Sequence, residues 1–305
     1  MSAPTAAFAV YNQIGINEDL EQTIYNIAPM DTYFYSNISR STAKNVLHEW
    51  QTDTLDAAVS TNKFIEGDDF SAQVVNPTTR LKNYCQIARK DFVVTDTANA
   101  VNTAGRKEEL AYQIMLKGQA LKRDIEKHLL SKENASAGTS ASPRSAAGVE
   151  TWIYTTNDVS ANTVTTNTTP APVSGLASTA GTDGTAVAVV EADLKNALQQ
   201  AWSQGGDTDV ILLSPTLKNK TDLFTGVATR FRNVAGGAQA DIVGASDVYV
   251  SSYGSHKVQL SRYCRASVIL CLDLSSWGIA WLRPIQMIDI AKSGDSEKRM
   301  LNWAH

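Results

Sequence analysis

The chain has 305 residues, of which 43% are hydrophobic and 19% charged, and its formal net charge is −4. This size and hydrophobic content exclude a disordered chain and allow one large domain or two. The acidic balance argues against a protein that grips nucleic acid by its phosphates, because such a protein would be basic. No run of about 18 apolar residues is present, so no membrane-spanning helix is predicted. The three cysteines, Cys85, Cys264 and Cys271, form no CxxC pair and indicate buried free thiols in a reducing compartment.

Residues 1–45 have little periodicity, and Pro29 breaks any helix through them. Two interpretations fit their aromatic residues equally well. The segment is an extended arm that grips another molecule through large flat side chains, or the aromatics fold back into the chain's own core. The aromatic residues are Phe8, Tyr11, Tyr25, Tyr33, Phe34 and Tyr35.

Residues 46–96 read as a long β-ribbon. Two runs rich in β-formers, at 57–65 and 84–95, flank turn signals at 66–69 and at Asn76-Pro77. A ribbon with arms of about 15 residues reaches roughly 50 Å and is only marginally stable alone in water. We therefore expect it to lie on a surface, supplied either by its own subunit or by a neighbour.

A long amphipathic helix is predicted from Asn102 to Ser131, with Asn102 or Thr103 as its cap. At a rise of 1.5 Å per residue it is roughly 40 Å long and spans most of a compact subunit of this size. A long core helix in an ordinary globular protein is the plainer interpretation. The apolar stripe consists of Leu110, Ile114, Leu121, Ile125 and Leu129, with Gly118 on the same face.

The remaining chain changes character twice. Residues 134–188 carry four charged side chains and read as irregular, around a short ordered patch that Trp152 and Tyr154 pin to the core. From Val190 the pattern predicts a helix up to Gly205-Gly206, a buried strand in DVILLS and a short helix from Pro215. Strands then follow to the C-terminal region. Helices and strands in this order indicate an α/β or α+β module around a central sheet.

The sequence offers no recognisable catalytic or metal-binding motif. HExxH, GxSxG, a P-loop and GxGxxG are all absent, and the four histidines are far apart. We interpret His128 as a solvated helix histidine, and the acidic group Glu66, Asp68 and Asp69 as a solvated turn rather than a cation site, because the EF-hand spacing is missing. Cys85 has no apparent partner that would make it a nucleophile. No catalytic residue, cofactor or metal is predicted.

Taken together, the segments resemble the tailed-bacteriophage major capsid proteins of the HK97-like fold, in particular the SU10-like family. Each motif is weak alone, but their order and spacing are specific, and they cover most of the chain apart from roughly 158–189. The segments that carry the resemblance are APMDTYFYSNISRSTAKNVLHEWQTDTL at 28–55, the EG pair at 66–67, TTRLKNYCQIARKDFVVTDTANAV at 78–101, LAYQIMLKGQALKRDIEKHLL at 110–130, ASPRSAAGVETWIYTTN at 141–157, WSQGGDTDVILLSPTLKNK at 202–220 and WLRPIQMIDIAKSGDSEKRMLNW at 281–303.

The resemblance implies an α+β fold with five parts. Residues 1–45 would be the N-terminal arm and 46–96 the extended β-hairpin loop. Residues 97–189 would be the peripheral domain, with the spine helix at 103–131 and an insertion at 134–189. Residues 190–280 would be the axial domain, and 281–305 would return to the peripheral domain. The final strand looks short. No helical leader precedes the arm, so by analogy with the family a separate scaffolding protein is expected.

The implied function is a major capsid protein that self-assembles into the pentamers and hexamers of an icosahedral phage head around double-stranded DNA. Expected partners are other copies of the chain, a scaffolding protein and a portal, with a decoration protein as an open option and DNA enclosed without sequence-specific contact. Assembly would take place in the host cytoplasm and leave the chain in the virion capsid. Crosslinking of Lys63 to a neighbour is not expected, because no partner residue is identifiable. The intersubunit contacts predicted are Tyr33, Phe34, Trp50, Lys63, Glu66, Asp68, Arg80 and Arg89.

Two alternatives to the capsid hypothesis stay open. An encapsulin-like compartment shell would use the same fold but enclose an enzyme instead of DNA. A soluble α/β enzyme would be a monomer with a deep pocket and perturbed titratable groups.

Overall fold

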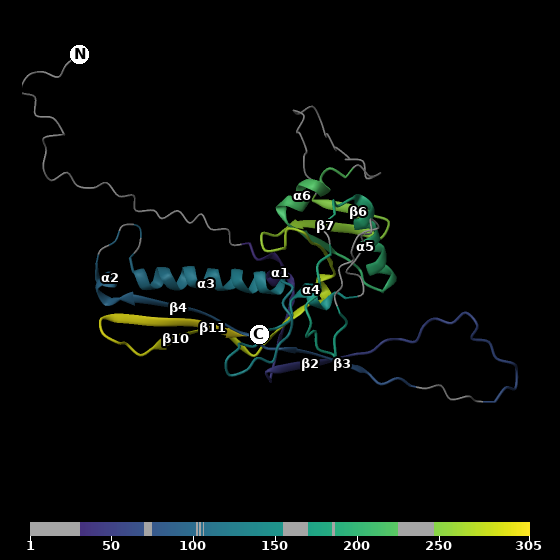
Figure 1. The fold of residues 1–305 in the computed structure, drawn as a ribbon, viewed down its shortest axis with the longest axis horizontal. Helices are drawn as coiled ribbons and strands as arrows, with labels where there is room; N and C mark the ends of the chain where they lie inside the picture. The colour runs from purple at the N-terminus through teal and green to yellow at the C-terminus, as the bar shows by residue number, and fades with distance from the viewer. Residues whose placement is uncertain are drawn as a thin grey trace, which may run out of the picture.

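The computed structural model describes residues 31–69, 75–101, 103, 105, 107–154, 170–184, 187–224 and 247–305. Its central feature is helix α3 (Glu109–Leu129), which runs along a three-stranded antiparallel sheet in the order β10-β11-β4 (Figure 1). Glu109 in the first turn and Lys127 in the last turn complement the helix dipole. The predicted long helix is thus confirmed over most of its length.

The helix starts later than predicted. Of the two proposed caps, Asn102 lies outside the described residues and Thr103 forms a β-bridge before the helix. Glu108 occupies the N-cap without a side-chain hydrogen bond. Gly105 has a φ of +77°, which interrupts a right-handed helix and explains the later start. A short helix, α2 (Asp96–Ala100), occupies the space before it.

The second half of the predicted ribbon belongs to this sheet instead. Strand β4 (Ile87–Thr95) pairs along its whole length with β11 (Ser296–Ala304), which in turn pairs with β10 (Arg283–Ile290). The alternation along β4 turns Val94 and Phe92 towards the core, and this burial fixes the strand against the body. The expectation of a short final strand is wrong, because β11 has nine residues.

Only the base of the ribbon forms a hairpin. Strands β2 (Leu47–Thr52) and β3 (Thr79–Tyr84) pair antiparallel over six residues each. The N-terminal part of the described chain forms α1 (Tyr33–Asn37) and β1 (Ser39–Thr42). Strand β1 pairs in parallel with β9 (Gly278–Trp281) of the same chain.

A second sheet, ordered β6-β7-β5-β8, stands at the C-terminal end of α3 (Figure 1). All four residues of β5 (Val210–Leu213) are buried, because Leu212 packs into the core shared with α3 and Leu213 packs under α5 (Glu191–Ser203). Ser214 caps α6 (Pro215–Thr221) by accepting a hydrogen bond from Leu217 N–H at 3.4 Å. The other strands are β6 (Val248–Ser251), β7 (Gly254–Leu260) and β8 (Ile269–Leu272), followed by the short helix η2 (Leu274–Ser276).

The described parts of residues 134–189 are irregular, as predicted, around the short helix α4 (Val149–Trp152). Trp152 packs against a small cluster of buried alanines, Ala135, Ala147 and Ala177. Tyr154 is 42% exposed, so the expectation that it pins this segment to the core is wrong.

Candidate assembly interface

The loop between β2 and β3 projects away from α3 and its sheet (Figure 1). Every described residue of this loop, at 53–69 and 75–78, is exposed. The predicted strand at 57–65 is absent, and turns occur near Ser60 and Glu66 instead. The reason is physical: two extended segments with no third strand and no covering surface gain too little burial to hold together in water.

Large apolar side chains of this loop point into solvent. An exposed single hydrophobic residue is ordinary, but several on one projecting segment mark an interaction surface. Their exposed fractions are 99% for Leu55, 64% for Val59, 71% for Phe64, 82% for Ile65 and 91% for Val75. The loop between residues 53 and 69 is also acidic, with five carboxylate side chains against the single lysine Lys63.

The base of the loop is tied firmly to the body. The Trp50 ring lies 5.4 Å from the Trp152 ring, measured between centroids. The backbone N–H of Lys82 donates to the Gly175 carbonyl at 2.9 Å. Gly175 has a φ of +78°, and a Cβ there would lie 2.0 Å from the Arg80 carbonyl oxygen, so only glycine permits this approach. These contacts fix the strands β2 and β3 against the body. We call this pair of strands the platform, and the loop projects from it.

The predicted contact residues fall into two groups. Phe34 is 1% exposed and packs edge-on against Trp277 of its own chain, so its side chain offers no surface to a neighbour. Tyr33 is half-buried beneath the Lys257 ammonium group, which lies 5.1 Å from the ring centroid. These two residues pack onto their own chain, as the second interpretation of the N-terminal aromatics expects. The other aromatic residues proposed for the arm, Phe8, Tyr11 and Tyr25, lie outside the described residues.

The remaining predicted contacts lie at the surface. Trp50 is half-buried on the platform, where Arg80 pairs with Glu49 at 3.4 Å. Arg89 is exposed on β4 and pairs with Asp91 at 3.3 Å. Lys63, Glu66 and Asp68 are exposed on the projecting loop. The structure brings these last three residues together, but it places Arg80 at the platform and Arg89 on the sheet.

A buried carboxylate joins the N-terminal segment to the long helix. Glu126 of α3 is fully buried and accepts hydrogen bonds from the backbone N–H groups of Phe34, at 2.9 Å, and Tyr35, at 2.7 Å. Burial raises the pKa of Glu126, and the two backbone donors partly oppose this effect. The carboxylate fixes α1 against the helix.

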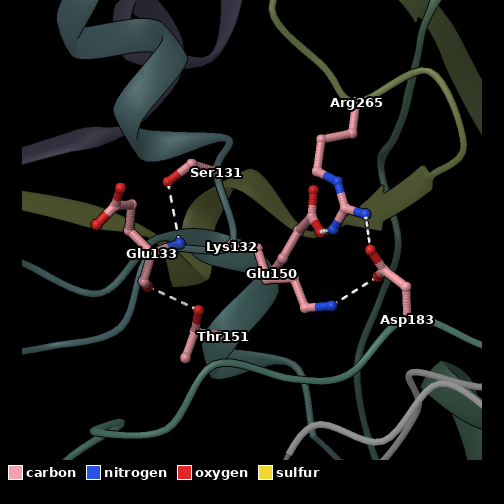
Figure 2. A network of polar contacts seen from close by, with 7 residues as sticks. All are labelled: Ser131, Lys132, Glu133, Glu150, Thr151, Asp183 and Arg265. Carbon is pink, nitrogen blue, oxygen red and sulfur yellow. Dashed lines mark hydrogen bonds and ion pairs between the residues drawn. The ribbon is translucent and has the colours of Figure 1, made fainter.

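A second polar network joins segments far apart in sequence (Figure 2). The guanidinium group of Arg265 donates to Glu150 of α4 at 2.7 Å and to Asp183, and Lys132 also donates to Asp183, at 2.6 Å. Beside it, the Thr151 hydroxyl donates to the Glu133 carbonyl at 2.7 Å. The network holds the end of α3, the irregular segment around 183 and the chain before β8 in one arrangement.

The network shifts the pKa values of its carboxyl groups in opposite directions. Burial raises the pKa of Glu150, although Arg265 opposes it. Hydrogen bonding from Lys132, and then from Arg265, lowers the pKa of the more exposed Asp183. Sequence reasoning missed this site, but a signal was available: Glu150 and Asp183 are two of only four charged residues between 134 and 188. A charged side chain in a stretch with so few charges indicates that it has a specific partner.

His128 also departs from its prediction as a solvated residue. Its ring meets the edge of the His305 ring at 5.6 Å, and His305 in turn stacks on Trp303 at 3.9 Å. Burial lowers the pKa of His128, and it lowers the pKa of His305 to about 3. Both histidines are neutral parts of the core between α3 and β11.

The described part of the chain holds no cluster of His, Cys, Asp or Glu suited to a metal ion. Burial raises the pKa of all three thiols, to about 11 for Cys264 and about 12 for Cys271, so none is activated as a nucleophile. No helix among the described residues is long and apolar enough to span a membrane.

Comparisons with known proteins agree with this architecture. The chain is 26% identical to the major capsid protein of Escherichia phage Phieco32 over 330 residues, which covers 99% of this chain and 93% of that protein. Its structure is similar to the capsid of a native GTA particle, with a TM-score of 0.59 and 12% identity over 99% of this chain and 94% of that chain. It is also similar to a chain of Microbacterium phage Oxtober96, with a TM-score of 0.57 and 13% identity over 95% of this chain and 88% of that chain.

At these identities the structural likenesses establish the HK97-like fold, and the family assignment depends on sequence. The family profile of the SU10 major capsid protein matches residues 3–304, which is nearly the whole chain. This is a family of structural capsid proteins and not a class of enzymes. With its projecting apolar loop on an HK97-like body, the chain belongs to the SU10 major capsid protein family and is a major capsid protein of a phage head.

Proposed function

We propose that this chain builds pentamers and hexamers of an icosahedral head, and that the loop 53–78 crosses to an adjacent copy in each ring. The observation that carries this proposal is the set of large apolar side chains on the loop that stay exposed in the single chain. A contact in which one surface of each copy meets a different surface of the next is heterologous and closes into rings.

Burial of these side chains supplies the driving force. Removing one Leu, Ile or Phe side chain from water contributes about 1.5–3 kcal/mol. Leu55, Phe64 and Ile65 alone thus supply several kcal/mol per contact before the cost of ordering the loop. Each subunit of a ring has two neighbours, so modest contacts add up to cooperative closure.

The division into parts follows the same proposal. Residues 1–45 act as the arm, 46–96 as the loop region, 97–189 and 281–305 as the peripheral domain and 190–280 as the axial domain. The four-stranded sheet with α5 and α6 supports an axial unit, and the α3 layer supports a peripheral one. Because β4 pairs with β11, the loop itself ends at β3, and residues 87–95 act with the peripheral domain.

We further propose a scaffolding protein, a portal and packaged double-stranded DNA as partners, with no catalytic role for the chain. The net charge of −4 favours a wall that holds DNA without sequence-specific contact. A decoration protein accompanies the capsid protein of Phage G, to which this chain is similar with a TM-score of 0.50 and 12% identity over 100% of this chain and 94% of that chain. An encapsulin-like shell is the remaining alternative. Such a shell would enclose an enzyme, whereas a phage head encloses DNA.

The experiment compares two forms of the protein by negative-stain electron microscopy, each expressed alone and with a co-expressed scaffolding protein. In the second form, an Asn-Gly turn replaces residues 53–78, because the paired Thr52 and Thr79 can be joined by a two-residue hairpin. The wild-type protein should form rings or shells, and the shortened form should fold but remain monomeric. Compact monomers of the wild type under all conditions would overturn the proposal, and an enclosed enzyme would favour the encapsulin alternative.

A further inference from the structure

An open cavity of about 430 Å³ lies where the start of β4 meets the loop 137–144. This volume is within the range of about 300–1,000 Å³ typical of protein pockets, so it can hold more than one side chain. Its apolar walls come from Ile87, Ala137 and Pro143, and Arg144 stands at its side. Ile87 is 48% exposed, so the apolar wall is open to an incoming group.

Arg144, like Arg40 and Arg123, has no carboxylate partner among the described residues; Arg40 lies over the Tyr35 ring and Arg123 donates to the Tyr263 hydroxyl, whereas Arg144 lines the cavity. Arg265 and Arg299 each contact two carboxylates, and the exposed Arg89 contacts one. Arg144 is half-buried, yet no carboxylate among the described residues pairs with it. Its charge acts instead on the buried Cys85 thiol, whose pKa it lowers against the larger effect of burial. A half-buried guanidinium group beside an apolar cavity is suited to a ligand that combines an apolar group with an anion.

The projecting loop carries such a combination. Phe64 and Ile65 are 71% and 82% exposed, and Glu66 follows them directly. Phe64 is the aromatic member of the exposed apolar set, and aromatic side chains are the usual anchors of protein interfaces. The loop of the same chain projects away from the sheet that contains β4 (Figure 1), and β4 begins at the cavity-lining Ile87, which favours a second copy as the source.

We propose that the cavity beside Arg144 receives Phe64 from the loop of a second copy of this chain, with Arg144 paired to Glu66 of that copy. This inference depends on the proposed function, since the loop must first cross to a neighbour. It goes further because it names the site that receives the loop and the pair of charges that aligns the loop with that site. Each copy then contributes one anchor and one cavity, as a heterologous ring requires.

Disulfide trapping in assembled particles tests the contact. The pair Phe64→Cys and Pro143→Cys, placed in one chain, should give a ladder of covalent oligomers on a non-reducing gel, because a disulfide needs Cβ atoms about 3.5–4.5 Å apart. The matched control is Val59→Cys with Pro143→Cys, since Val59 is similarly exposed on the same loop, at 64%. The control should give no ladder. Ser142→Cys replaces Pro143→Cys if the latter does not fold.

A charge exchange supplies the second readout. Arg144→Glu and Glu66→Arg should each lower the assembled fraction about tenfold, because like charges then face each other, and the double variant should restore it. Shells that form normally without the Phe64–Pro143 ladder would overturn the cavity contact and leave the loop-crossing proposal intact. A disulfide formed within one chain would overturn the choice of a second copy. Failure of the wild type to assemble would remove the proposed function, and this inference with it.

Discussion

At the residue scale, Arg265 compensates the charge of a carboxylate that water can hardly reach. Its partner Glu150 has a side chain only 10% exposed. Arg265→Ala should lower the free energy of unfolding by about 2–3 kcal/mol, less than a fully buried pair because Asp183 remains half-exposed. Arg89→Ala, which breaks an exposed pair with Asp91, should cost about 0–1 kcal/mol. Urea denaturation followed by tryptophan fluorescence measures both, and equal effects would contradict the role given to Arg265.

Glu126 provides the second prediction at this scale. Glu126→Ala leaves two backbone N–H groups buried without an acceptor, which should cost about 2–4 kcal/mol of unfolding free energy, whereas Glu126→Gln keeps one acceptor and should cost less. Burial raises the pKa of Glu126 in the folded state, so its contribution to stability is complete below pH 4.5 and is lost as pH rises through the folded pKa. Glu126→Gln should therefore reduce the fall in stability above pH 4.5. Denaturation curves at several pH values test this, and an unchanged pH profile would contradict it.

At the element scale, the contact between α3 and β11 depends on neutral histidines. The pKa of His305 is lowered to about 3 in the folded chain, from 6.5 in the unfolded one. The unfolded chain therefore takes up the proton first, and stability is lost as pH falls below 6.5, by about 1.4 kcal/mol per pH unit. Between pH 6.5 and 5 this amounts to about 2 kcal/mol, which His305→Phe should remove, leaving only the acid-induced loss that His128 contributes, because burial lowers its pKa too.

The control for this element is His48→Phe. His48 lies on β2 next to Trp50, outside the ring stack of His128, His305 and Trp303. Urea denaturation at pH 7, 6 and 5 should show the full acid-induced loss in this control and in the wild type, and a reduced loss in His305→Phe. Parallel acid profiles for all three proteins would contradict the assignment of the effect to His305.

At the scale of the whole molecule, the loop contributes to assembly and not to the stability of the single chain. Replacing Leu55, Phe64 and Ile65 together by serine should change the unfolding free energy by less than about 0.5 kcal/mol, because these side chains are exposed. The same change should weaken the contact between two copies by about 100-fold or more, since each side chain would lose about 1.5 kcal/mol of burial.

The matched control replaces three exposed apolar residues outside the loop, Val173, Leu223 and Val248, by serine. It should assemble as the wild type does. Analytical ultracentrifugation and electron microscopy report assembly, and thermal unfolding reports stability. Shells formed by the loop variant at wild-type concentration would show that these side chains do not carry the contact.

The local sequence pattern was sufficient to predict the elements whose structure depends mainly on their own residues. The long helix, α5, the buried strand β5 and the capped α6 follow from apolar period and end signals, because each buries one stripe or one run of residues. The family followed from the order of these segments. At the candidate site, the loop was named from its breakers and its expected need for a surface; the described loop residues are exposed, and the contact with a neighbour stays a prediction.

Other features depended on contacts between distant segments, which no local pattern encodes. The sequence of β4 suits a ribbon as well as a sheet, and only its burial beneath α3 and its pairing with β11 decide between them. Phe34 is a core residue because its ring packs against Trp277, while Glu126, 92 positions away, accepts its backbone N–H. Periodicity and end signals thus determined by themselves the main helices and the buried strand β5, whereas the choice of an α+β, HK97-like fold depended on the family resemblance. Tertiary structure alone decided which aromatics are buried, where Arg265 finds its carboxylates and which apolar loop residues are left exposed, since each of these depends on what lies opposite a side chain in space.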